Sequence, residues 1–275
     1  MKRKPLSHIC KMHYARLVYR ATLLLAAIVL YVVSCIKPFD AAWLPSALFE
    51  WDPFLSVAMP VFSPILLGVV LVALGGEMLL RFFPSRHDSR GAQKHRKCNF
   101  IPTRQTTPPK RSWVRTFLIV VFWLTLNGIF AALYYTGIID ACVLFLISLA
   151  YAVCDLICIL FFCPFQTWIL KNRCCATCRI YNWDFIMMTT PLAFIPSVYT
   201  YALFGLSLAL FLQWEILLRR HPERFCESTN AYLACAKCPE KLCRSKPQLQ
   251  GFLKKHFSGA SSEREESSEP AVPKQ

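Results

Sequence analysis

Five runs of about 20 apolar residues are the feature that most limits how this chain can fold. A helix needs about 20 apolar residues to cross the ~30 Å hydrocarbon layer of a membrane. None of the runs alternates between apolar and polar residues, as the strands of a membrane barrel do. The 17% charged residues and the mean hydropathy of +0.40 are also atypical of a soluble domain. We therefore expect an all-α, polytopic membrane protein.

The expected spans cover residues 17–36, 64–83, 113–135, 138–163 and 197–218. Only TGIID separates the third span from the fourth, which predicts an antiparallel helical hairpin. Arg20 lies near the start of the first span, where we expect its side chain to reach the headgroups.

The segment before the fifth span, residues 185–196, is apolar but is interrupted by Pro191 and Pro196. Proline removes a backbone donor and breaks a regular helix. Such backbone is tolerated at membrane depth only where neighbouring groups satisfy it. We expect a re-entrant or interfacial segment here.

The distribution of charge predicts the topology. Residues 1–16 and the 84–112 loop are rich in Lys and Arg, so the positive-inside rule places both in the cytoplasm, in a protein of the cell membrane. Five crossings would leave the tail outside, whereas Arg219, Arg220 and Arg224 favour the cytoplasm, and both alternatives stay open. The basic start and VVSC also resemble a cleaved lipoprotein signal, but the apolar run is long for one.

The flanking regions differ from the membrane domain in composition. We expect a basic N-terminus over residues 1–16, a transmembrane domain over 17–218, a polar cysteine-containing tail over 219–257, and a disordered Ser-, Glu- and Pro-rich end over 258–275. The net charge of +15 fits topology and attraction to anionic lipids, and no nucleic-acid-binding module is present. The expected partners are the lipid bilayer and a membrane redox or assembly partner.

Two groups of cysteines have the spacing of metal ligands. In CCATC, Cys174 precedes the pair Cys175 and Cys178, and in CAKCPEKLC the pair Cys235 and Cys238 precedes Cys243. Two residues between thiolates let both sulfurs turn toward one ion, as in zinc and iron–sulfur sites. We predict a shared site for zinc or an iron–sulfur cluster, which requires both groups on one membrane face. The alternatives are separate reducible thiol pairs, or a local disulfide in an exported tail.

A second constellation lies in VCDLICILFFCPF, at the end of the fourth span. Cys154 and Cys158 are one helical turn apart on one face, Asp155 is adjacent, and Cys163 follows where the helix should end. An ionisable residue inside a span is a functional hypothesis by default. The structural alternatives for Asp155 are a hydrogen bond to Asn127 or a hydrated position near the headgroups.

The other intramembrane acids suggest structural roles. Two acidic residues stand four positions before an arginine, the favourable order for a helical ion pair: Glu77 with Arg81, and Glu215 with Arg219. Asn182 and Asp184 precede an apolar segment, and we expect them to cap a helix there.

The motifs EWDPFLSV and FFCPFQTWILKNRCCATC resemble those of polytopic iron–sulfur membrane proteins of the quinol-dehydrogenase electron-transfer type. In that family an apolar helix ends in a Cys-Pro motif and a cysteine-rich, ferredoxin-like segment follows. Cys163 with Pro164 matches the motif, and Cys175 with Cys178 matches the start of that segment. The resemblance covers residues 50–83 and 154–184, and it implies a cofactor near Cys163 and Cys174 with electron transfer to a quinone or a protein.

The leading functional hypothesis is therefore an integral membrane protein with a cysteine-ligated metal site. The alternative is a metal-independent transporter or assembly partner that uses Asp155 and Asn127. A membrane thiol–disulfide enzyme using Cys175 and Cys178 is a third possibility, although the usual βαβ context of such a pair is missing. No motif of hydrolytic or phosphoryl-transfer chemistry is present.

Overall fold

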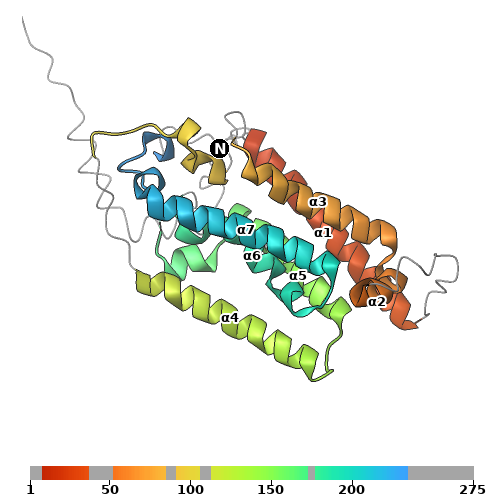
Figure 1. The fold of residues 1–275 in the computed structure, drawn as a ribbon. Coiled ribbons are helices and arrows are strands. Elements are labelled where there is room, and N and C mark those ends of the chain that lie inside the picture. The colour runs from red at the N-terminus through yellow and green to blue at the C-terminus, as the bar shows by residue number, and fades with distance from the viewer. Residues whose placement is uncertain (1–7, 37–51, 85–90, 106–112, 173–176, 235–275) are drawn as a thin grey trace, which may run out of the picture.

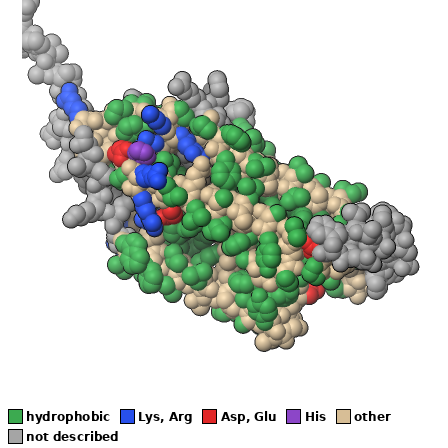
Figure 2. Space-filling model, in the orientation of Figure 1, with side chains coloured by type: hydrophobic (Ala, Val, Ile, Leu, Met, Phe, Trp, Pro, Cys, Tyr) green, Lys and Arg blue, Asp and Glu red, His purple; other side chains and the backbone are tan. Residues whose placement is uncertain are grey.

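The computed structural model describes residues 8–36, 52–84, 91–105, 113–172 and 177–234, and these are helical with no strand of a sheet among them. The expected spans are present as five long apolar helices (Figure 1): α1 (His8–Ile36), α3 (Pro64–Phe82), α4 (Trp113–Tyr135), α5 (Ala141–Leu160) and α7 (Val198–Arg220). Many large apolar side chains on their outer faces are exposed (Figure 2). The chain is a multi-pass helical membrane protein. We call the end of the bundle at which α1 begins the proximal end, and the other the distal end.

A short helix, α2 (Pro53–Phe62), precedes α3 and is separated from it by Ser63. Pro64 disfavours helical backbone at the residue before it, and Ser63 has a φ of 66°. The Ser63 hydroxyl accepts a hydrogen bond from the Ile65 amide at 3.3 Å. Residues 53–76 contain no charged side chain, but because of this break the apolar run forms two helices instead of one long span.

The predicted hairpin of α4 and α5 is confirmed by a tight turn over residues 136–140 at the distal end. Gly137 has a φ of +75°, which glycine adopts without a steric penalty. Asp140 caps α5 by accepting a hydrogen bond from the Val143 amide at 2.7 Å.

The proline-interrupted segment forms two short helices, α6 (Asp184–Thr189) and the 3-10 helix η7 (Thr190–Phe194). At the proximal end Asp184 pairs with Arg81, in the last turn of α3. Ser197 reaches the distal end, where its hydroxyl donates to Asp52 at 2.8 Å. The segment therefore continues from one end of the bundle to the other within about 14 residues. It contains too few residues for a regular helical span. It is packed mainly against protein, so its backbone does not need the regular helix that contact with lipid would require.

This short crossing of the bundle places the end of α7 at the proximal end. There the segment after α7 packs on the loop between α3 and α4: the Ala231 amide donates to the Ile101 carbonyl at 2.8 Å, and the His95 ring stacks on Phe225 with centroids 4.4 Å apart. Exposed Lys and Arg side chains gather at this end (Figure 2), including Arg219 and Arg220. The arginines after α7 thus share one end with the basic α3–α4 loop, as positive-inside reasoning favoured.

Labelling with a membrane-impermeant maleimide tests this topology. In a cysteine-depleted chain, we expect single cysteines at Cys98 and at Arg220→Cys to react from the same side of the membrane, and Cys35 from the other side. Positions 35, 98 and 220 are all exposed. Labelling of Arg220→Cys together with Cys35 would show five crossings instead of six.

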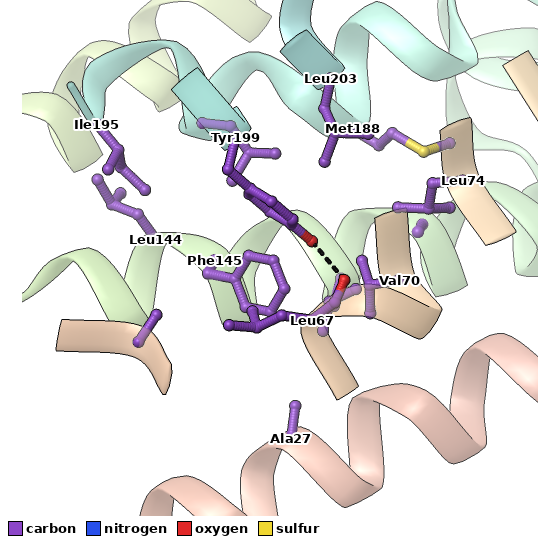
Figure 3. Close-up of a cluster of buried hydrophobic side chains, with 14 of the residues drawn as sticks. Ala27, Leu67, Val70, Leu74, Leu144, Phe145, Met188, Ile195, Tyr199 and Leu203 are labelled. Carbon is purple, nitrogen blue, oxygen red and sulfur yellow. Dashed lines mark hydrogen bonds between the residues drawn. The ribbon is translucent and has the colours of Figure 1, made fainter. Parts of the chain in front are cut away.

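The largest core cluster joins α1, α2, α3, α5, α6, η7 and α7. Figure 3 shows its centre, where the Tyr199 ring lies beside Phe145 and its hydroxyl donates to the Leu67 carbonyl at 2.9 Å. Ala27 brings α1 against this cluster with a fully buried methyl group. None of the buried residues of the cluster comes from α4, so this helix lies at the periphery of the bundle.

Candidate functional site

A cavity of about 720 Å³ separates the outer helix α4 from the proximal half of α5. Its walls are mostly apolar and aromatic, and they include Phe122, Trp123 and Trp168. Four thiols and two carboxylates also line it: Cys154, Cys158, Cys163, Cys178, Asp155 and Asp184. The cavity thus combines an apolar volume with groups that can exchange electrons and protons.

Local sequence explains why three of the thiols meet. Cys154 and Cys158 are four residues apart on α5, so they lie on the same helical face, as predicted. The helix ends at Leu160, close to the expected Cys163-Pro164 boundary, and a π-helical turn, η4 (Phe165–Ile169), follows Pro164. The Cys158 and Cys163 side chains interact across this break, and both line the cavity. They form an adjacent thiol pair at the cavity wall.

Asp155 lies between this cavity and the interior of the bundle. The Arg20 guanidinium on α1 approaches it at 3.7 Å and donates to the Ala152 carbonyl at 2.9 Å. The shorter ion pair of Arg20 is with Glu77 on α3, at 2.5 Å, and the Tyr19 hydroxyl also donates to Glu77. Glu77 therefore carries most of the pairing with Arg20, and Asp155 stays accessible to a ligand in the cavity.

Two predictions about these charges are wrong. The Arg20 side chain is 3% exposed and points into the bundle, so it does not reach the headgroups. Glu77 pairs with Arg20 and with Arg16 (3.5 Å) instead of Arg81. In a low-dielectric interior, an ion pair between helices is much stronger than one on a solvated helix surface, which makes tertiary partners the preferred ones.

Arg81 instead binds the segment that enters the short crossing. It pairs with Asp184 at 2.6 Å, donates to the Asn182 side-chain oxygen at 3.0 Å, and lies 4.2 Å from the centre of the Phe185 ring. Asn182 and Asp184 therefore do not cap α6, and the prediction that they do is wrong. Trp183 is the N-cap residue, and its side chain makes no capping hydrogen bond. The nearby guanidinium uses the polar atoms that a cap would need.

A second interhelical pair replaces the predicted pair of Glu215 with Arg219. Glu215 on α7 accepts hydrogen bonds from Arg179 at 2.8 Å and from the Trp183 indole at 3.0 Å, while Arg219 is exposed. Arg179 belongs to the 3-10 helix η6 (Arg179–Asn182) at the joint between η4 and α6. This pair fixes the joint against α7 beside the cavity.

Asn127 does not take part in the candidate site. Its side-chain amide donates to the Trp123 carbonyl at 2.9 Å within α4, and the structure records no hydrogen bond from it to Asp155. Its buried side-chain oxygen has no hydrogen-bond partner among the described residues. The hydrogen bond to Asn127, one of the two structural alternatives for Asp155, is therefore not present between these described residues.

The predicted metal ligands and the two predicted cofactor-binding cysteines are only partly within the described residues. Cys163 and Cys178 both line the cavity. The remaining ones lie outside the described residues: Cys174, Cys175, Cys235, Cys238 and Cys243. Within the part of the chain that the structure describes, no group of three or more His, Cys, Asp or Glu residues could hold a metal ion. The shared zinc or iron–sulfur site stays a prediction.

Comparison of the chain with known protein families, curated proteins and solved structures gave no match. The resemblance to quinol-dehydrogenase iron–sulfur proteins therefore has no support from them. Sequence reasoning found Asp155 and the thiols of α5, but it missed that Arg20, Arg81 and Asp184 surround them. The available signal was the balance of arginines and acids inside or beside otherwise apolar runs.

Proposed function

We propose that this protein is a membrane-embedded thiol oxidoreductase whose Cys158 and Cys163 pass two electrons to a quinone bound between α4 and α5, with the N-terminus in the cytoplasm. The observation that carries the proposal is an adjacent thiol pair in the wall of an aromatic cavity, beside a carboxylate. It retains the electron transfer expected from the sequence, with thiols as the electron donors.

The cavity suits an apolar ring that arrives from the membrane. Its volume of about 720 Å³ lies within the range of small-molecule sites, ~300–1,000 Å³. Phe122 and Trp168 line it and are also exposed on the outer surface, at 53% and 70%. An entrance between α4 and η4 would therefore face lipid, the phase in which quinones dissolve.

The chemistry balances with the groups at the site. Asp155, which lies within electrostatic range of both thiols, takes the proton of one thiol. The sulfur–sulfur bond between Cys158 and Cys163 then forms as two electrons pass to the quinone. The quinone becomes a quinol by taking two protons, one from the second thiol and one returned by Asp155. Arg20, at 3.7 Å from Asp155, stabilises the carboxylate before it takes the proton and after it returns it.

The second candidate is a metal centre at the same joint. Cys163 and Cys178 line one cavity although η4 and residues 173–176 separate them in the chain. Together with Cys174 and Cys175, they would supply four thiolates from one segment, enough for zinc or an iron–sulfur cluster. The transporter alternative rests on Asp155 alone, because Asn127 is engaged within α4.

Anaerobic, reduced protein in detergent provides the test. After addition of a short-chain ubiquinone analogue, we expect the ultraviolet absorbance of quinol to appear. Alkylation followed by mass spectrometry should then show two fewer reactive thiols per chain. Cys158→Ser and Cys163→Ser should each abolish this reaction, and Asp155→Asn should slow it roughly 10²- to 10⁴-fold.

Cys142→Ser is the matched control, because Cys142 is a buried thiol near the start of α5, remote from the cavity lining. Undiminished quinone reduction by Cys158→Ser would contradict the proposal. Zinc or iron that is present in the native protein and lost in Cys178→Ser would support the metal centre instead.

A further inference from the structure

A second hollow, of about 760 Å³, lies at the distal end of the bundle, where α1, α4, α5 and α7 meet. Four tyrosines line it, contributed by three helices: Tyr31 of α1, Tyr134 and Tyr135 of α4, and Tyr201 of α7. Its lining contains one charged residue, Asp140. This site shares none of its lining with the thiol cavity.

The carboxylate of Asp140 keeps capacity for a ligand. One of its oxygens caps α5 through the Val143 amide at 2.7 Å, and the other accepts a hydrogen bond from the Tyr31 hydroxyl at 3.3 Å. Two carboxylate oxygens accept about four hydrogen bonds. No Lys, Arg or His lines the hollow, so within the described residues the negative charge has no cationic partner there.

Three of the tyrosines are held by contacts of their own. The Tyr134 and Tyr135 rings lie 5.3 Å apart between centroids at an angle of 57°, the Tyr31 ring stacks against Phe62, and the Tyr135 hydroxyl donates to the Phe194 carbonyl at 3.5 Å. Tyrosine is enriched at membrane–water interfaces, which explains why these residues lie near the distal end of the helices. It does not explain why four of them line one hollow with an acid.

We propose that this hollow binds a quaternary ammonium group, with tyrosine rings around the cation and Asp140 as its counter-ion. The negative faces of aromatic rings attract cations within about 6 Å of the ring centre, and aromatic cages recognise such groups. A bare metal ion fits less well, because a hard cation needs about six oxygen ligands and this site offers one carboxylate. The same chemistry occurs in a phosphatidylcholine headgroup and in a small free cation such as choline.

Equilibrium dialysis of labelled choline against the full-length protein in a maltoside detergent tests the proposal. We expect saturable binding that falls roughly tenfold or more in Asp140→Asn. Asparagine caps a helix about as well as aspartate, so this variant keeps the cap of α5 and removes only the charge. Tyr201→Leu should weaken binding several-fold, whereas Tyr201→Phe, which keeps an aromatic ring, and Tyr14→Leu, which lies outside the hollow, should retain it.

The neutral carbon isostere 3,3-dimethylbutan-1-ol distinguishes cation recognition from simple apolar filling. It should compete poorly with choline, and equal competition would overturn the proposal. So would unchanged choline binding by Asp140→Asn or the absence of saturable choline binding. Nanodiscs separate the two sources: a lipid-headgroup site should bind choline in phosphatidylglycerol discs and lose it in phosphatidylcholine discs, whereas a site for a free cation should bind it in both.

Discussion

Replacing Arg81 by leucine is expected to lower the free energy of unfolding by about 3 to 5 kcal/mol, because it leaves a buried carboxylate without its cation. Arg81 is 2.6 Å from Asp184, whose side chain is 3% exposed, and it also binds Asn182 and Phe185. These contacts anchor the start of the short crossing to the end of α3. The loss should appear as a lower midpoint of thermal unfolding in detergent.

Two further variants identify the cause of this loss. Arg219→Leu removes an exposed arginine and should change stability by less than about 0.5 kcal/mol. The double variant Arg81→Leu, Asp184→Leu should recover a large part of the lost stability, since no buried charge is then left unpaired. If Arg81→Leu alone were as stable as the native protein, the interhelical pair would have no structural role.

The five long helices could be predicted from sequence because their signal is local. A run of about 20 apolar residues must cross the membrane as a helix whatever surrounds it. The predicted boundaries at Trp113, Tyr135 and Leu218 lie within about two residues of the observed ends. The turn between α4 and α5 is likewise encoded by the few residues between the two spans.

The short crossing could not be counted in the same way. Residues 184–197 are packed against α5 and α7, for example through the Ser148 hydroxyl on the Met188 carbonyl at 2.6 Å and the contact of Thr189 with Ser207 at 2.6 Å. Protein groups, not lipid, satisfy this segment, so it needs neither the length nor the regularity of a span. Its identity as a crossing depends on tertiary structure.

The predictions of charge partners were wrong for a related reason. Sequence spacing identifies neighbours on one helix, but Glu77, Arg81 and Glu215 each found partners on other elements. For the thiols, spacing placed Cys154 and Cys158 on one face correctly. The approach of Cys178 to the same cavity depends on the break after α5.

Replacing Asp52 is expected to have the second large effect on stability, and the sequence did not suggest a role for this residue. Its side chain is buried, with the residue 1% exposed, and it caps two helices at once. One oxygen accepts from the Phe54 amide of α2 at 3.0 Å, and the other from the Ser197 hydroxyl at 2.8 Å and the Val198 amide of α7 at 2.9 Å. Asp52→Ala should therefore cost about 2 to 4 kcal/mol, the sum of two caps and a buried charge-assisted hydrogen bond.

This contribution should depend on pH. Burial alone would raise the pKa of Asp52, but hydrogen bonds from Ser197 and from backbone amides of α2 and α7 outweigh it and hold the pKa below its ordinary value. Because the folded pKa is lower than the unfolded one, the stabilisation is complete above the unfolded pKa of about 3.9 and is lost as the pH falls through the folded pKa. The difference in stability between native protein and Asp52→Ala should be constant near neutral pH and shrink below about pH 4.

Asparagine separates the two caps of Asp52. An amide oxygen can still accept at one helix, but the amide NH₂ would then face the backbone donors of the other. Asp52→Asn should therefore lower stability by at least roughly half as much as Asp52→Ala does. Asp140→Asn is the matched control, because Asp140 caps α5 alone with a single oxygen and is exposed. Its stability should change by only a few tenths of a kcal/mol. Equal losses in the two asparagine variants would mean that Asp52 acts through its charge and not by joining α2 to α7.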